Sequence, residues 1–387
     1  MKYLALLTIF TPVTFAAPVR NRSIRTPSLL IYDGPRLSTF RVRDNGGKFN
    51  SPKGGVSPPK PVYHVESDFD YQSINLALNQ EWIELDLFRY GLKRFSNREF
   101  EDAGLNEDDR YLIGFMADQE VGHARALGNL LGGPPKADAA SKPCKYTYPF
   151  HTVREFVDFC QKLTRWGESG VYGFLPHLDS RPSAQILLQS ITTEARQQMI
   201  FRQFEGLFAM PVWFETGITQ SMAWTLLAPY LESCPQENPK IKWRNFPALN
   251  VTNNPSGINT DYGPAISRNR PHLTEPGRKV TLTWEDPGKK VGPKNFDYVT
   301  ATAVEGKAKY AAWVSQFNVT YTPLENIQGN SASTEQPGTL VYPDLGDPQV
   351  NGTTFIAITD TNLFVTPANL SLIDNHIVAG PAIYQAY

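Results

Sequence analysis

The sequence has almost no excess of charge of either sign. Its 37 lysine and arginine residues face 38 aspartate and glutamate residues, which leaves a formal net charge of -1 at pH 7 with histidine neutral. Proteins that bind nucleic acids or anionic membranes by electrostatic attraction carry an excess of basic residues. The composition therefore gives no electrostatic basis for a nucleic-acid partner, and we expect none.

Long apolar runs are also missing. The N-terminal run from Tyr3 to Phe15 is too short to cross a bilayer as a helix, and no later segment reaches the required length, so we expect no membrane span. Lys2 precedes this run and the small residues Ala16 and Ala17 follow it, an order typical of a secretory signal peptide. Residues 1–17 are accordingly predicted to be a signal peptide, and the mature protein to be secreted, either free or associated with the cell wall.

Cysteine is scarce, and its positions exclude one class of metal site. The three cysteines allow at most one intrachain disulfide, and no Cys-x-x-Cys pattern is present, which disfavours a thiolate zinc site. Cys160 falls within a helical pattern and is expected to be a small core residue. Cys144 and Cys234 lie in polar, proline-containing connections beside helix ends, so we expect these two to form a disulfide.

Asn-x-Ser/Thr sequons without a middle proline agree with a secretory route. Each sequon alone is a weak signal, but together with the predicted signal peptide they indicate a glycoprotein. The predicted acceptors are Asn21, Asn250, Asn318, Asn351 and Asn369.

A chain of 387 residues is long enough for two domains, and its apolar spacing changes once along its length. The spacing is helical in the first part and close to a period of two in the last. We therefore predict an α+β chain, a four-helix bundle with an extra helix followed by an antiparallel β-rich domain. In order, the predicted parts are a signal peptide (1–17), an extended N-terminal arm (18–65), the helical bundle (66–232), a Pro/Asn-rich connector (233–279) and the β-rich C-terminal domain (280–387).

The β-rich part contains short runs bounded by Gly, Pro, Asn and Asp, which is typical of strands joined by turns. Its simplest arrangement is a small antiparallel sandwich or sheet. One stretch, Lys307 to Trp313, is also compatible with a helix, and no catalytic cluster stands out in this half. The predicted strands are Val280 to Trp284, Phe317 to Thr322, Thr339 to Tyr342, Thr353 to Thr359, Asn362 to Thr366 and His376 to Ala379.

The segment from Arg110 to Leu131 places two ionisable residues on the apolar face of a predicted helix. Read at alternating steps of three and four, the face carries apolar residues except at Glu120 and His123. Buried ionisable groups must be paired, neutralised or bound to a metal. Glu-x-x-His is also the spacing by which helix bundles direct two ligands at a dinuclear metal centre.

The other three long helices each add a carboxylate to the predicted interior. Glu81 lies on the apolar face of the first helix, whereas Glu84 falls toward its edge. Glu168 lies on the third helix between two glycines, which favours either a close approach to a neighbour or a position on the rim. On the fourth helix, Glu194 is followed three residues later by Gln197, where a histidine would repeat the Glu-x-x-His motif.

Three stretches, LALNQEWIELDLFRYGL, DQEVGHARAL and TTEARQQ, together with TRWGESGVYGFLPHLDS and FRQFEGLFAMPVWFE, resemble a known family. They are similar to the ferritin-like domain of secreted fungal proteins described as stress-response or late sexual development proteins, and the resemblance covers roughly residues 67–231. It implies a carboxylate-bridged di-iron or di-manganese site. The implied ligands are Glu81, Glu120, His123, Glu168 and Glu194.

Gln197 departs from the pattern of metal-binding ferritin-like domains, in which a second histidine stands at this place. An amide oxygen is a poorer ligand for iron than an imidazole, so the second metal position would be weakened or empty. Two functions remain open. One is a secreted, stress- or development-related protein with a degenerate site for one or two iron or manganese ions. The alternative is a non-enzymatic cell-surface or cell-wall protein, structural or binding, that carries no metal.

Overall fold

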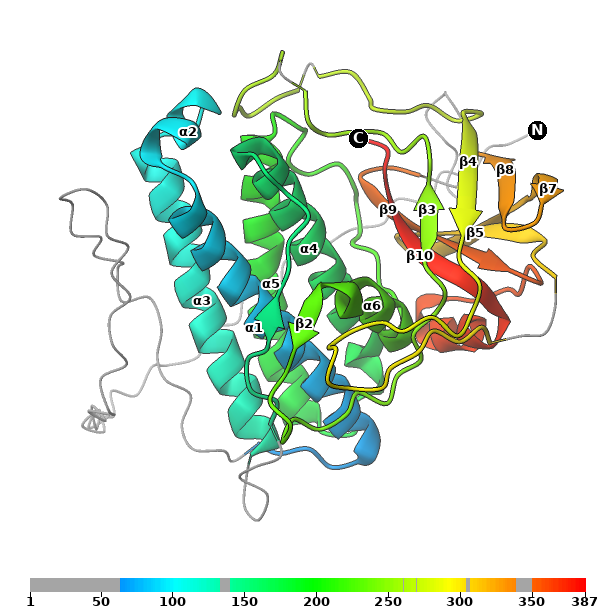
Figure 1. Ribbon diagram of the computed structural model, residues 1–387, viewed down its shortest axis with the longest axis horizontal. Coiled ribbons are helices and arrows are strands. Elements are labelled where there is room, and N and C mark those ends of the chain that lie inside the picture. The colour runs from blue at the N-terminus through cyan, green and yellow to red at the C-terminus, as the bar shows by residue number, and fades with distance from the viewer. Residues whose placement is uncertain (1–62, 133–139, 260, 269, 304–306, 339–349) are drawn as a thin grey trace, which may run out of the picture. The chain divides into compact units, whose positions relative to one another are not determined.

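The computed structural model describes residues 63–387 except 133–139, 260, 269, 304–306 and 339–349 (Figure 1). The predicted signal peptide, nearly all of the predicted arm, Asn21 and the predicted strand at 339–342 lie outside the described residues. The described residues belong to one compact unit. Apart from a two-residue strand at Lys145–Tyr146 and a 3-10 helix at Pro367–His376, the helices come first and the strands afterwards, as in an α+β architecture.

Four long helices form a bundle, as the sequence predicts. Contacts join α1 to α3, α4 to α5, α1 to α4 and α3 to α5, and the short helix α6 packs on α4 (Figure 1). A further short helix, α2, lies between α1 and α3 in the chain. The bounds are α1 Asp68–Arg94, α2 Asn97–Asp102, α3 Glu107–Leu131, α4 Val153–Phe174, α5 Arg181–Phe204 and α6 Gln220–Leu227.

The helix starts are fixed by side-chain caps that the sequence makes visible. In the sequence, Asn106 before the acidic run Glu107 to Asp109 predicts a helix start, and Asn106 does cap α3: its side-chain oxygen accepts hydrogen bonds from the backbone N–H groups of Asp108 and Asp109. The carboxylate of Asp109 in turn accepts a hydrogen bond from the backbone N–H of Asn106. Ser67 caps α1 and Thr152 caps α4 in related ways. Such caps satisfy backbone donors that have no partner within the helix, and each contributes about 1 kcal/mol.

The sequence pattern predicts a fourth helix that reaches Phe208 and a further helix from Trp213 to Leu231, and the structure shortens both. The fourth helix ends at Phe204 rather than continuing toward Phe208, because Gly206 adopts a φ of +67°, outside the helical region. The helix predicted from Trp213 begins only at Gln220, where Thr219 caps it.

Strands β3 to β10 form two four-stranded antiparallel sheets. The strand orders are β10-β9-β5-β6 and β3-β4-β8-β7. The bounds are β3 Leu249–Val251, β4 Lys279–Trp284, β5 Tyr310–Ser315, β6 Asn318–Pro323, β7 Glu325–Gln328, β8 Ser331–Glu335, β9 Thr353–Thr359 and β10 Ile377–Gln385. Among the predicted strands, 362–366 is an irregular segment, and the stretch 307–313, also compatible with a helix, contributes to strand β5.

The sheet that contains β9 is the middle layer of three. Phe355 and Ala357 of β9 belong to the same apolar core as helices α4 and α6, whereas Ile356 and Ile358 pack into a core shared with the second sheet. Every residue of β9 is buried. A strand covered on both faces loses the alternation of polar and apolar residues, which also explains why the Ala-rich β5 was ambiguous in the sequence.

A disulfide ties two connections together beside the bundle. Cys144 and Cys234, the pair expected from the sequence, are bonded to each other, and Cys160 is a buried free thiol. The cross-link stands next to the small sheet of β1, Lys145–Tyr146, and β2, Leu231–Ser233. In the described part of the chain, no helix combines the length and apolarity needed to cross a bilayer.

Candidate metal centre

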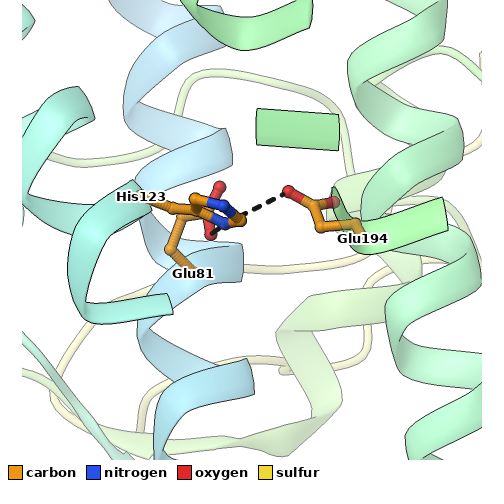
Figure 2. A group of neighbouring side chains, drawn as sticks. All are labelled: Glu81, His123 and Glu194. Carbon is orange, nitrogen blue, oxygen red and sulfur yellow. Dashed lines mark hydrogen bonds and ion pairs between the residues drawn. The ribbon is translucent and has the colours of Figure 1, made fainter. Parts of the chain in front are cut away.

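His123 lies where three helices of the bundle bring carboxylates together (Figure 2). Its Nδ1 atom is 3.0 Å from Oε2 of Glu120 on the same helix and 3.2 Å from Oε2 of Glu81 on α1. Oε1 of Glu194 on α5 is 3.7 Å from the same nitrogen. The glutamate and histidine that the sequence places on the inner face of α3 therefore meet the inner carboxylates of two neighbouring helices.

The other nitrogen of His123 determines what Nδ1 can do. Nε2 is 3.0 Å from the hydroxyl oxygen of Thr193, and that hydroxyl donates its own proton to the carbonyl of Ser190 at 2.7 Å. Because the hydroxyl proton is already used, Thr193 accepts from Nε2, which must carry a hydrogen. The neutral imidazole is then held in the tautomer whose Nδ1 lone pair faces the carboxylates.

The pKa values of His123 and the surrounding glutamates depend on burial and on the charges of one another. Burial raises the pKa of Glu81 to about 8, against the opposing attraction of His123, and burial raises the pKa of Glu194 well above its ordinary value. Burial disfavours the Glu120 carboxylate too, but attraction to His123 and hydrogen bonds lower its pKa. Burial opposes protonation of His123, but Glu120 and Glu81 raise its pKa well above the ordinary value. A cation in this cluster relieves repulsion among the carboxylates, and a proton on His123 is the smallest such cation.

Glu84 also belongs to the carboxylate cluster formed with Glu81, Glu120, His123 and Glu194, although the sequence pattern did not place it there. It was expected at the edge of the apolar face, yet it is 1% exposed, and its pKa is raised by burial and by repulsion from Glu120 and Glu81. Its Oε1 accepts a hydrogen bond from Gln80 at 2.8 Å, while its Oε2 has no hydrogen-bond partner among the described residues.

Glu168 is buried but interacts with a different set of groups. Its Oε2 lies 3.2 Å from the guanidinium of Arg165, and its Oε1 accepts a hydrogen bond from Tyr172 at 2.8 Å. The pKa of Glu168 is raised to about 7, mainly by burial and also by the charge of Glu215, while the charge of Arg165 opposes this rise. Glu81, His123 and Glu194 form the group whose ligand atoms lie within 4.8 Å of one another. Glu84 thus interacts electrostatically with Glu120, Glu81 and His123, whereas Glu168 contacts Arg165 and Tyr172.

Comparison with known proteins identifies the fold of this site. The ferritin-like domain family matches residues 69–207. Over 352 residues the chain is 50% identical to the protein rds1 of the fission yeast Schizosaccharomyces pombe, a match that covers 87% of this chain and 86% of rds1. The chain belongs to the fungal ferritin-like family. Its long helices α1, α3, α4 and α5 make up most of the matched region.

Within this ferritin-like domain, Gln197 acts as a hydrogen-bond donor. Its amide nitrogen donates to Oε1 of Glu120 and, at 3.2 Å, to the side-chain oxygen of Gln119. Its own oxygen has no hydrogen-bond partner among the described residues. In this arrangement the amide group that faces Glu120 is the NH₂, which cannot bind a metal. Gln197 therefore orients one carboxylate of the cluster at the place where a second histidine would stand.

The sequence analysis did not predict Thr193 or Glu84 as part of this site. Of the two, only Glu84 could have been predicted from the sequence pattern. Thr193 stands directly before Glu194 in TTEARQQ, but its contact with His123 depends on how α5 is rotated against α3. Glu84 follows Glu81 by one helical turn, so a broader inward face of α1 would have included it.

Proposed function

We propose that the bundle binds at least one iron or manganese ion between Glu81, His123 and Glu194. The observation that carries this proposal is the direction of His123: Thr193 fixes the hydrogen on Nε2, and Nδ1 faces carboxylate oxygens from two other helices. Imidazole and carboxylate ligands suit iron and manganese. Two buried oxygens without hydrogen-bond partners, Oε1 of Glu194 and Oε2 of Glu84, fit the same cation.

Each residue of the cluster has a role in this proposal. Glu81, His123 and Glu194 hold the ion, and Glu84 completes its carboxylate shell. Oε2 of Glu120 lies against His123, while Gln197 donates to Oε1 of Glu120. Iron or manganese, when bound, would supply one-electron chemistry with oxygen or peroxide. With a glutamine at position 197, the site holds its first ion more tightly than any second one.

The test is elemental analysis of protein purified without chelators and without a metal-affinity column. We expect iron or manganese in stoichiometric amount, and its loss from His123→Ala. Glu168→Gln is the matched control, because Glu168 is a buried glutamate of the same bundle that pairs with Arg165 instead. Circular dichroism and thermal melting establish that both variants fold.

One observation favours the alternative of a metal-free scaffold. A protonated His123 can donate from Nδ1 to Glu120 or Glu81, and Gln197 satisfies the remaining oxygen of Glu120, so the cluster has internal partners without a metal. In that case, wild-type protein and Glu168→Gln both lack metal even after anaerobic incubation with iron(II). The bundle would then be the frame of a cell-surface or cell-wall protein.

We also propose that the protein is secreted and glycosylated. The Cys144–Cys234 disulfide supports this, because disulfides persist mainly in oxidising compartments. The acceptors Asn250 and Asn318 are exposed, which leaves room for a glycan. Glycosidase treatment of protein from the culture medium should lower its apparent mass. Protein that stays inside the cell and shows no such change would contradict this part of the proposal.

The stress- or development-related role implied by the family resemblance belongs to the same proposal. Expression of this chain in fission yeast lacking rds1 would test it, with survival in peroxide and completion of mating as the readouts. We expect rescue by the wild-type chain. Failure of His123→Ala to rescue, at equal protein level, would connect the role to the cluster.

A further inference from the structure

A hydrogen-bonded path leads from the carboxylate cluster to a buried tryptophan. Gln80 of α1 donates from its amide nitrogen to Glu84 at 2.8 Å, and its amide oxygen accepts from the indole N–H of Trp166 at 3.0 Å. Trp166 is 2% exposed. α1 and α4 approach closely here, since a Cβ added to Gly167 would lie only 2.7 Å from the side chain of Gln80.

Aromatic rings continue this path beyond the bundle interior. Trp166 stacks on Tyr230 with ring centroids 5.7 Å apart and an interplanar angle of 11°. Phe159 contacts both rings, at 5.9 Å from Trp166 and 4.9 Å from Tyr230. On its other side Phe159 lies 6.1 Å from Tyr148, which in turn is 5.0 Å from the exposed Tyr90. These spacings are those of rings in direct contact.

Tyr148 differs from the other rings of this series in having a base at its hydroxyl. The hydroxyl donates to Oδ2 of Asp86 at 2.7 Å, and Asp86 is exposed to solvent. Tyrosine loses an electron readily only when its phenolic proton has somewhere to go, so an acceptor at this distance matters. Tyr146, which stacks on Tyr148 at 6.5 Å, instead accepts a hydrogen bond from the backbone N–H of Cys144.

We propose that Gln80, Trp166, the Tyr230–Phe159 pair and Tyr148 form a route for electrons between the carboxylate cluster and the protein surface. The inference rests on the proposed function, because it needs a metal-loaded cluster and a peroxide as oxidant. The route lets an excess oxidising equivalent leave the bundle interior and reach Tyr148, whose hydroxyl bonds to the exposed Asp86.

Hydrogen peroxide takes up two electrons and two protons and leaves as two water molecules. One electron would come from a metal ion held by Glu81, His123 and Glu194, whose charge would rise by one, and the other comes from Trp166. Tyr148 returns an electron to Trp166 and passes its phenolic proton to Asp86, which exchanges it with solvent. The two protons that peroxide consumes are taken up from solvent, so the net product is a neutral tyrosyl radical at Tyr148.

To test the route, the iron(II)-loaded, full-length protein is mixed with hydrogen peroxide and the sample is frozen. The electron paramagnetic resonance spectrum of the frozen sample is then recorded. Iron content is measured on the same samples. We expect a tyrosyl radical signal that narrows when the protein is made with ring-deuterated tyrosine. The signal should vanish in Tyr148→Phe and in Trp166→Phe. It should persist in Tyr146→Phe, the matched control from the same stack of rings.

The outcomes separate this inference from the proposed function. Protein that holds iron but gives no tyrosyl radical overturns the route and leaves the metal site standing. A radical that survives in Tyr148→Phe but disappears in Tyr172→Phe also overturns it, because Tyr172 donates to Glu168 and lies outside this series of rings. Protein that binds no iron overturns both.

Discussion

The hydroxyl oxygen of Thr193 lies 3.0 Å from Nε2 of His123, and this contact sets which nitrogen of the imidazole faces the carboxylates. The hydroxyl proton goes to the carbonyl of Ser190, so Thr193 can only accept from the ring. The two residues come from different helices, α5 and α3. The packing of α5 against α3 thus determines the tautomer of His123, which the Glu-x-x-His motif on α3 alone does not define.

Thr193→Val should weaken metal binding, because valine keeps the shape of threonine but cannot accept from Nε2. Loss of a contact that orients a metal-binding histidine typically lowers affinity about 10- to 100-fold. Thr193→Ser should restore most of it. Thr192→Val is the control, since the hydroxyl of exposed Thr192 bonds only to the carbonyl of Gln189. Competition with a metal indicator measures the affinities, and equal values for the two valine variants would contradict the role of Thr193.

Gln197→His should raise the metal content toward two ions per chain. The substitution completes a second Glu-x-x-His on α5 and removes the amide that occupies Glu120. Gln198→His is the control, because Gln198 is also buried but is the next residue along the helix and lies on another face. Elemental analysis after anaerobic loading gives the stoichiometry. The idea fails if both histidine variants hold the same amount of metal as the wild type.

Asp374 should make the free energy of unfolding fall as the pH rises from about 4 to about 6. Burial raises the pKa of Asp374 to about 6, although hydrogen bonds from Thr219 and Ser221 and the charge of Arg244 lower it. A folded-state pKa above the unfolded value means that the folded state binds the proton more tightly. This contribution is therefore present in full below the unfolded pKa and is lost as pH rises through about 6. The loss is about 3 kcal/mol for a shift of about two units.

Asp374→Asn isolates this effect from other titrating groups. The amide oxygen can still accept from Thr219, which bonds to Asp374 at 2.6 Å, and no charge is buried at high pH. Chemical denaturation should give nearly equal stabilities for the variant and the wild type at pH 4, and a more stable variant at pH 7. A stability difference that does not change with pH would show that Asp374 has an ordinary pKa.

Removal of the disulfide should lower the free energy of unfolding by roughly 3 to 5 kcal/mol. The bond closes a loop over a sequence separation of 90, so its loss gives the unfolded chain much more freedom. Cys144→Ser/Cys234→Ser should therefore melt earlier than the wild type, and reductant should not lower its melting temperature further. Cys160, a buried free thiol, should stay unreactive toward alkylating reagents until the protein unfolds. A melting temperature equal to that of the oxidised wild type would refute the prediction.

The sequence predicted those features of the site that depend on neighbouring residues within one helix. The inward face of α3 and the Asn106 cap depend only on local spacing and local hydrogen bonds, and both carry through to the structure. The choice between Glu84 and Glu168 depends on how helices rotate against each other, which spacing within one helix does not reveal. Gly167 signalled a close approach, and that approach is to Gln80 rather than to a metal ligand.

The β-rich part shows a second limit of sequence analysis. β5 contains two alanines and a tryptophan that suit a helix as well as a strand, and only its place between β9 and β6 makes it a strand. Local preference is weak for such a segment, and tertiary packing decides its structure. The disulfide between Cys144 and Cys234 was easier to foresee, because three cysteines leave few pairs to choose from.

The middle layer of the fold also bears on how this protein can evolve. Successive residues of β9 face different layers, so a change at Phe355 is felt by the helices, and a change at its neighbour Ile356 is felt by the second sheet. Strand β7, whose four residues are all exposed, carries no such double constraint. Among relatives of this chain, substitutions should accumulate on β7 and be rare on β9. The rate of sequence drift across the β-rich half would then follow its layers.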